Sequence, residues 1–194
     1  MKKLLAVILV MIMLVSFTGC GRLWLLLGIA ETLTTPGIVG SDADEEQELL
    51  PYMNLPEYSE DFKEILGYID IDEERIEKFM GYCKAAHDKY DAKQFCKYMV
   101  YKADTEIFNV LSDAMKEEAD KTVNDSSEEA FRRTFALQEM NFDLITIKAG
   151  LSAYDLAYFD IDESGDASAY EDLKESYVYF INQFAKLVYD KEII

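Results

Sequence analysis

The sequence predicts an all-α fold: a bundle of five or six helices that follows an N-terminal apolar anchor and a tether. The three prolines lie at positions 36, 51 and 56, and beyond residue 56 there are only four glycines. Folds rich in β-hairpins need far more of both residues at their turns. Beyond residue 56 the apolar residues recur every three or four positions, which is typical of amphipathic helices. Because 50% of the residues are hydrophobic, we expect a folded core.

The first element, residues 1–20, has the layout of an export signal. Lys2 and Lys3 are followed by an uncharged apolar stretch, residues 4–15, and by small residues just before Cys20. This layout resembles the lipobox of bacterial lipoproteins, with Phe17 where that family usually has leucine. The resemblance implies cleavage before Cys20 and lipidation of its thiol. It also implies a domain anchored to the bacterial cell membrane and facing outside the cytoplasm.

A second apolar run, residues 23–30, leaves an alternative open. The two runs together are long enough for an uncleaved signal anchor of the same topology, although residues 19–22 interrupt them and a span needs about twenty continuous apolar residues. The run could also be the first helix of the core. Residues 31–56 contain the prolines and an acidic stretch, a composition typical of a tether. We therefore divide the chain into a signal peptide (1–20), an apolar run with a tether (21–56) and a helical domain (57–194).

The excess of acidic residues argues against some classes of binding partner and favours others. The chain has 19 basic and 38 acidic residues and a net charge of −19, which becomes −21 when Lys2 and Lys3 are removed with the signal. Such a surface repels phosphate backbones, so nucleic acid is not an expected partner. It attracts cations and basic protein patches, and it also favours solubility.

Helix starts and breaks are clear in the first half of the domain. Ser59 and Asp72 are N-cap candidates, the pattern breaks at residues 88–91, and Asp104 or Thr105 restarts it. The expected core-facing residues are Phe62, Ile65, Leu66, Ile69, Ile76, Phe79, Met80, Cys83, Phe95, Cys96, Met99, Val100, Ala103, Ile107, Phe108, Leu111 and Met115.

In the second half, Ser126 and Glu129 have the spacing of a capping box, and Gly150 is an expected helix stop. A short helix over 152–159 and a long one over about 168–189 complete the prediction. The core-facing residues expected between the capping box and Gly150 are Phe131, Phe135, Met140, Phe142 and Ile145.

Cys83 and Cys96 lie at similar distances on either side of the expected turn near residues 89 and 90. In an antiparallel helical hairpin such residues sit side by side, and export makes a disulfide chemically feasible. The alternative is two small buried hydrophobic residues.

Residues 160–171 carry acidic and small polar side chains at regular intervals, with a glycine in the middle. The spacing resembles the twelve-residue EF-hand calcium loop, although Ala167 stands where that family has a larger apolar residue. The resemblance implies calcium ligation by Asp160, Asp162, Ser164, Asp166 (through its carbonyl), Ser168 (through water) and Glu171. Alternatively, the same residues serve helix starts and turns, with Ser168 and Glu171 as a capping box.

Catalytic signatures are nearly absent from the sequence. His87 is the single histidine, which excludes an H-E-x-x-H zinc site, and there is no G-x-S-x-G. We interpret His87 as a capping or packing residue. The aromatic residues of 170–184 are expected mainly in the core. No catalytic residue or cofactor other than calcium is expected.

Two functional hypotheses follow. The first is a cell-surface lipoprotein whose non-enzymatic helical domain binds a protein or another envelope component. The second is an envelope enzyme that uses carboxylates. A filled bundle with an exposed apolar patch favours the first, which we prefer, and a concave cluster of acids favours the second.

Overall fold

The structure is a computed structural model that describes residues 49–122 and 125–194, which belong to one compact unit, Gln47–Ile194. The predicted signal, Cys20, the apolar run 23–30 and the tether up to residue 48 lie outside these residues. The described part contains no strand, which confirms the all-α prediction. Its helices are α3 (Glu60–Leu66), α4 (Glu73–Lys89), α5 (Ala92–Tyr101), α6 (Ile107–Thr122), α7 (Glu128–Ser164) and α8 (Ala169–Tyr189).

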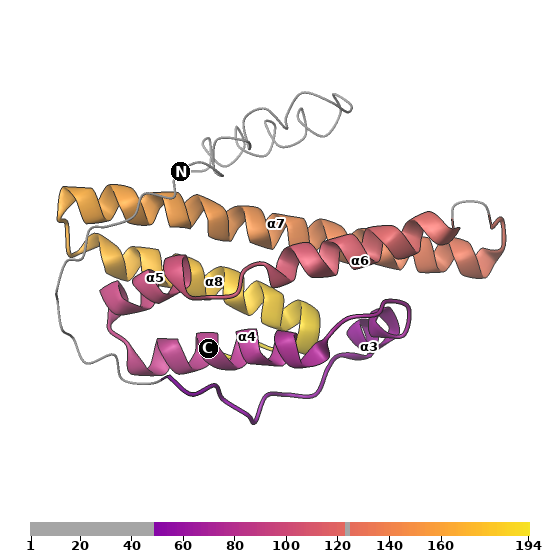
Figure 1. Ribbon diagram of the computed structural model, residues 1–194, viewed down its shortest axis with the longest axis horizontal. Coiled ribbons are helices and arrows are strands. Elements are labelled where there is room, and N and C mark those ends of the chain that lie inside the picture. The colour runs from indigo at the N-terminus through magenta and orange to yellow at the C-terminus, as the bar shows by residue number, and fades with distance from the viewer. Residues whose placement is uncertain (1–48, 123–124) are drawn as a thin grey trace, which may run out of the picture. The chain divides into compact units, whose positions relative to one another are not determined.

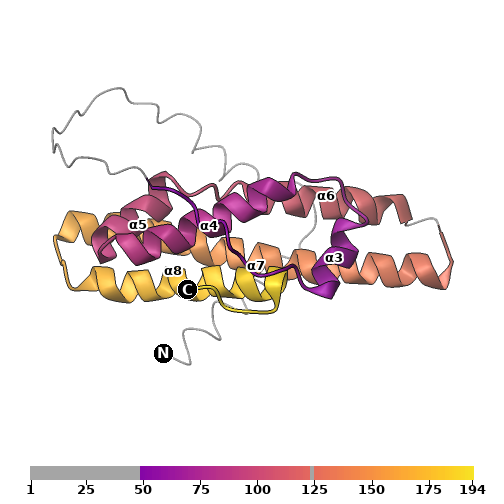
Figure 2. The same cartoon turned by 90° about the horizontal axis from the view of Figure 1, so that it is seen from below.

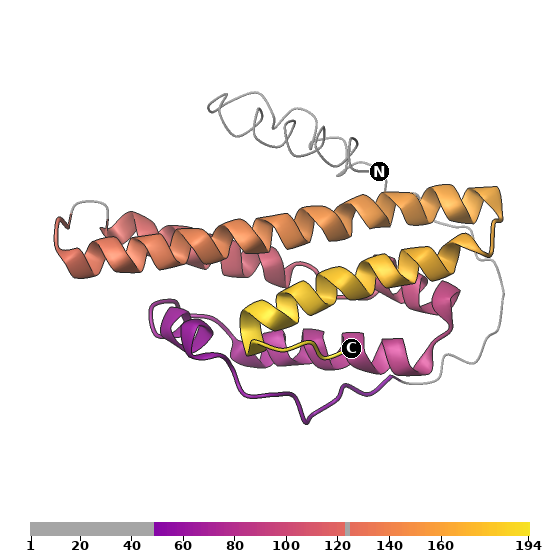
Figure 3. The same ribbon diagram turned by 180° about the vertical axis from the view of Figure 1, so that it is seen from behind.

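Two helices organise the bundle. The longest, α7, contacts α6 along its first part and α8 along its second part (Figures 1 and 3). The last helix, α8, also contacts α3, α4 and α5. It lies between α7 and α4 in the view of Figure 1 and along the lower side of the bundle in the view of Figure 2. One face of α7 therefore rests on α6 and α8 along most of its length.

The helix starts follow the predicted capping chemistry closely. Ser59 accepts a hydrogen bond from the backbone N–H of Phe62 at 3.2 Å, and Asp72 accepts one from Glu74 at 3.1 Å. Such side chains satisfy N–H groups that have no partner inside the helix. The capping box predicted at Ser126 is one residue off, because Ser127 is the cap of α7.

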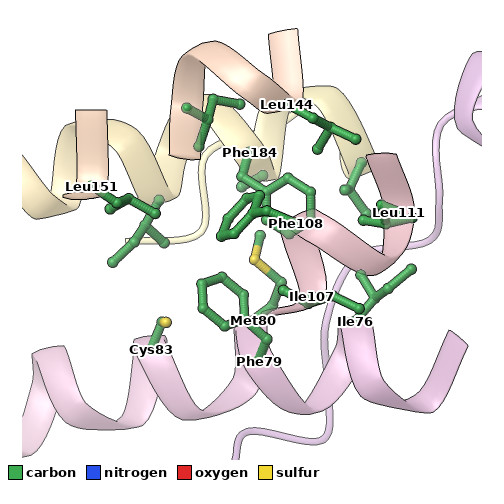
Figure 4. Packing of buried hydrophobic residues seen from close by; sticks show 14 of the residues in the cluster. Ile76, Phe79, Met80, Cys83, Ile107, Phe108, Leu111, Leu144, Leu151 and Phe184 are labelled. Carbon is green, nitrogen blue, oxygen red and sulfur yellow. The ribbon is translucent and has the colours of Figure 1, made fainter. Parts of the chain in front are cut away.

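The core is filled by side chains from all the described helices. Figure 4 labels those that α4, α6, α7 and α8 contribute near its centre. At its centre the ring of Phe108 from α6 lies 4.8 Å from Phe184 of α8 and 5.4 Å from Phe79 of α4, measured between centroids. Edge-to-face and tilted contacts of this kind add to the free energy gained by burying the rings. Cys83 and Cys96 belong to this core as free, buried thiols, so the predicted disulfide is not formed in this structure.

The folded unit begins earlier than the predicted boundary at residue 57. The backbone N–H of Tyr52 donates to the carbonyl of Gly81 on α4 at 3.1 Å, and Leu49 and Leu55 pack on the core. A Cβ on Gly81 would collide with the Tyr52 carbonyl, so this glycine permits the close approach. The last residues of the predicted tether are thus part of the domain.

The predicted helix stop at Gly150 and the separate helix over 152–159 are wrong. The helix α7 continues through both, from Glu128 to Ser164. A Cβ at Gly150 would overlap the ring of Phe180 on α8, so the glycine makes room for a neighbouring side chain instead of ending the helix. Gly165, at φ +69°, is the residue that ends α7 in the left-handed conformation.

Candidate interaction surface

The helix α7 carries two apolar stripes on roughly opposite faces. The first faces the core and contains Ala130, Leu137, Met140, Leu144, Ile147, Leu151 and Tyr158. The second faces outward and follows the alternating spacing of four and three residues that characterises a coiled-coil a/d seam. We call this second set the α7 seam: Phe131, Phe135, Gln138, Phe142, Ile145, Ala149, Ser152, Leu156 and Phe159, all of them exposed.

The bulky members of the seam are well exposed. The exposed fraction is 71% for Phe131, 66% for Phe142 and 69% for Leu156. The seam covers about 29 residues, roughly 42 Å at 1.5 Å per residue. Single exposed apolar residues are common on protein surfaces, but six bulky ones along one face of a helix are typical of a binding surface.

This result corrects the predicted core face of the segment. Of the five residues expected in the core, Met140 is buried, whereas Phe131, Phe135, Phe142 and Ile145 are exposed. Both stripes have helical spacing, and the outer one holds the larger aromatic rings. Periodicity alone therefore could not show which of the two stripes faces α6 and α8.

Polar contacts fix the orientation of α7 about its own axis. Near its start, Arg133 forms an ion pair with Glu118 of α6 and lies over the ring of Tyr68 at 4.4 Å from the centroid. Lys148, near the middle, donates to Asn109 of α6. These contacts join α7 to its neighbours on the side away from the seam, so the seam points outward.

Two contacts with α8 continue this attachment toward the end of α7. The hydroxyl of Tyr177 donates to the Asp155 carboxylate at 2.7 Å, and that of Tyr170 donates to Asp162 at 2.8 Å. Burial raises the pKa of Asp155 above its usual value, and the hydrogen bond from Tyr177 partly offsets this effect.

The two ends of the seam differ in charge. Arg132 lies beside Phe131 at the first end, where it pairs with Glu128 at 2.6 Å on the exposed surface. At the other end Phe159 is followed by the exposed Asp160. The first end of the seam thus has an exposed guanidinium beside the carboxylates of Glu128 and Glu129, whereas the other end is acidic.

The exposed ring of Tyr101 widens the apolar surface at the acidic end of the seam. Tyr101, at the end of α5, is 60% exposed and lies 6.2 Å from the Phe159 ring between centroids. It also makes an edge contact with Tyr158, at 6.0 Å. The apolar surface at this end therefore extends from α7 onto α5.

A groove borders the seam on the α8 side. It has a volume of about 370 Å³, and its lining includes Asp143 and Thr146 of α7 with Tyr179, Phe180 and Lys186 of α8. A second hollow, of about 330 Å³, lies between residues 55–58, Lys63 and Glu77. The first groove therefore makes the protein surface concave next to the seam, between α7 and α8.

The residues of the EF-hand-like stretch do not form a calcium cage in this conformation. Asp160, Asp162 and Ser164 lie in the last two turns of α7, where the Asp162 side chain points away from the face that Asp160 and Ser164 share. Across residues 49–122 and 125–194, no group of three or more His, Cys, Asp or Glu side chains is placed to hold a metal ion.

Several of these polar side chains have local partners instead. The Ser164 hydroxyl donates to the Ile161 carbonyl at 2.9 Å, and Asp166 accepts from both the N–H and the hydroxyl of Ser168. Ser168 begins α8 without a capping hydrogen bond, so the alternative capping box with Glu171 is not formed. Here the stretch serves mainly as the connection between α7 and α8.

The remaining candidate residues have structural contacts. The ring of His87 meets the edge of Phe95 at 6.0 Å, and its Nδ1 lies 3.1 Å from Asp88. Desolvation raises the pKa of the Cys83 thiol above its usual value, and that of Cys96 to about 12, so neither is a reactive thiolate near neutral pH. Among the aromatic residues of α8, Tyr170, Tyr177 and Phe184 are buried and Tyr179 is exposed.

Comparison with known proteins gives no relative from which to transfer a function. No protein-family model, curated protein or solved structure matches the chain. In the part of the chain that the structure describes, no helix is both long enough and apolar enough to cross a membrane.

Proposed function

We propose that this chain is a bacterial cell-surface lipoprotein whose helical domain is a non-enzymatic interaction module, and that it binds through the α7 seam. The exposed row of apolar side chains carries the proposal. The core is closely filled, whereas the seam leaves a row of bulky apolar side chains in water. Covering such a row with a partner recovers the free energy lost by hydrating it.

The anchoring part of the proposal rests on residues 1–20 and their resemblance to a lipobox. Two acyl chains hold a protein stably at a bilayer where one does not. The acidic surface repels anionic lipid and envelope polymers, which favours a domain held away from the membrane surface. A basic or apolar protein surface fits this domain better than nucleic acid does.

Anchoring has a direct test. If Cys20 carries the lipid, the mature chain begins at that residue and partitions into the detergent phase. The Cys20→Ser variant should lose that partitioning and appear in the aqueous phase. A variant that still partitions with membranes would favour the uncleaved signal anchor.

The interaction surface can be tested in cells by photo-cross-linking. A photoreactive residue at position 142 of the full chain should give a discrete adduct, because Phe142 lies in the middle of the seam. Position 50 is the matched control, since Leu50 is 70% exposed but lies away from α7. The adduct at 142 should disappear with Phe135→Ser. Equal labelling at both positions, or none at 142, would argue against the seam as the binding surface.

A further inference from the structure

We propose that the α7 seam pairs with the same seam of a second copy, antiparallel, so that the chain forms a two-fold symmetric dimer. This inference rests on the proposed function, because it names the partner that covers the seam. It is carried by the order of large and small residues along the seam, the charges at its ends and the apolar area that it offers.

The seam residues have the spacing that two paired helices require. Written as a heptad repeat, the a positions are Phe135, Phe142, Ala149 and Leu156, and the d positions are Phe131, Gln138, Ile145, Ser152 and Phe159. A helix whose a and d residues face a partner inserts each of them between side chains of that partner. Within residues 49–122 and 125–194, the core-facing stripe of α7 is occupied by α6 and α8, and the seam is the apolar stripe left uncovered.

The order of large and small side chains favours the antiparallel arrangement. With the two-fold axis at the level of Ile147, the middle of the seam pairs Phe142 of one copy with Ser152 of the other, and Ile145 with Ala149. Farther out, Phe135 faces Phe159, and the two rings stack at each end of the interface. In an in-register parallel pair Phe142 would face Phe142 and Ser152 would face Ser152, which crowds one layer and leaves a gap in another. Interfaces pack well when bulky side chains oppose small ones.

The charges at the ends of the seam agree with this orientation. Antiparallel pairing brings Arg132 of one copy toward Asp160 of the other, where Asp160 competes with Glu128 for the guanidinium. An in-register parallel pair would keep Arg132 and Asp160 at opposite ends of the interface. Charge pairs at the edge of a helix pair select its orientation more than they add to its affinity.

The apolar area is sufficient for a weak to moderate dimer. The six bulky residues of the seam are between 42% and 71% exposed. At about 190 Å² for a full side chain of this size, they offer roughly 650 Å² per copy. A standard interface uses about 800 Å² per partner, and Tyr101 and the margin of the seam supply further area. A two-fold contact uses this same patch twice, so a single seam suffices for both copies.

The net charge predicts how the dimer responds to salt. Each mature copy, without Lys2 and Lys3, carries a net charge of −21, against −19 for the full sequence, so two copies repel each other at low ionic strength. Screening by salt reduces this repulsion far more than it weakens the apolar contact. A dimer of this chain should therefore tighten as salt rises, whereas a complex with a basic partner should weaken.

The test is cysteine cross-linking of the full chain in its membrane or in detergent. Two differently tagged forms are co-expressed, one with Phe142→Cys and one with Ser152→Cys, and then treated with a mild oxidant. Cys83 and Cys96 are buried and do not interfere. The mixed pair should give a disulfide-linked dimer on a non-reducing gel, and each form expressed alone should give little. Because positions 142 and 152 are both exposed, the substitutions leave the core intact.

Each outcome decides the proposal. Cross-linking of the mixed pair that increases with salt and is lost with Phe135→Glu, but not with the control Leu50→Glu, supports the antiparallel dimer. Stronger cross-linking of either single form overturns the antiparallel arrangement. If no pair cross-links but the photoreactive residue at 142 still captures another protein, the dimer is wrong and the proposed function stands. If neither experiment gives an adduct, both proposals fail.

Discussion

Asp155 of α7 makes a structural hydrogen bond, but burying its carboxylate costs free energy. Its carboxylate is half-buried between α7 and α8 and accepts a hydrogen bond from Tyr177. Burial raises its pKa, so between the usual value of 3.8 and the raised value the folded chain binds a proton that the unfolded chain has released. Its contribution to stability is therefore fully present below the usual pKa and is lost as the pH rises through the folded pKa.

Asp155→Asn should stabilise the domain at pH 7, because asparagine keeps an acceptor for Tyr177 without a charge to desolvate. The gain should be a few tenths of a kcal/mol, since the site is partly open to solvent and screening reduces the effect. Urea unfolding at pH 7 and near pH 4 measures it, and the difference from wild type should shrink in acid. Asp143→Asn, an exposed position on the same helix, is the control. A less stable Asn variant at pH 7 would contradict this account.

At the scale of the residue, the sequence predicted the short-range features best. Ser59 and Asp72 cap the helices that they were expected to cap, because an N-cap bond joins residues only two or three positions apart. Ser127 takes the role expected of Ser126, and both serines precede the same helix. The acidic stretch 160–171 was harder to interpret, since helix ends and calcium loops use the same residue types.

At the scale of the element, α7 and α8 are held close together at Gly150. Gly150→Ala should destabilise the domain by about 2 kcal/mol, because overlap with the Phe180 ring outweighs the gain of about 1 kcal/mol in helix propensity. Chemical unfolding measures the change. Ser152→Ala, exposed two residues further on, should be neutral or slightly stabilising. Phe180→Ala combined with Gly150→Ala should cost less than the two single changes together. Additive effects would show that the two residues do not collide.

The end of α7 makes a second prediction at this scale. Calcium could bind residues 160–171 only if the end of α7 unwinds from Asp160 onward, since Asp160, Asp162 and Ser164 are all helical. We therefore expect thermal melts of the wild type in EGTA and in several millimolar calcium to coincide. A stabilisation of roughly 1.4 kcal/mol at ten times Kd, absent in Glu171→Gln, would instead establish the EF-hand-like site.

At the scale of the whole molecule, the sequence predicted the fold class but not which face of α7 is exposed. The scarcity of proline and glycine and the three-to-four spacing are properties of single segments, so they pointed to helices directly. Which stripe of α7 is buried depends on α6 and α8, and no local signal in residues 128–164 records that choice. Likewise, the role of Gly150 inside the continuous helix α7 depends on the ring of Phe180, which is thirty residues away in the sequence.

The position of α8 in the chain has a consequence for the order of events during synthesis. It follows α3 to α7 in the chain, yet it contacts α3, α4, α5 and α7. Its buried Tyr177, Ile181 and Phe184 complete the core, so the earlier helices have no filled interior to fold around until α8 has been synthesised. An export machinery that threads unfolded polypeptide would receive this chain before it could close. Sequence order alone would then keep it ready for transport.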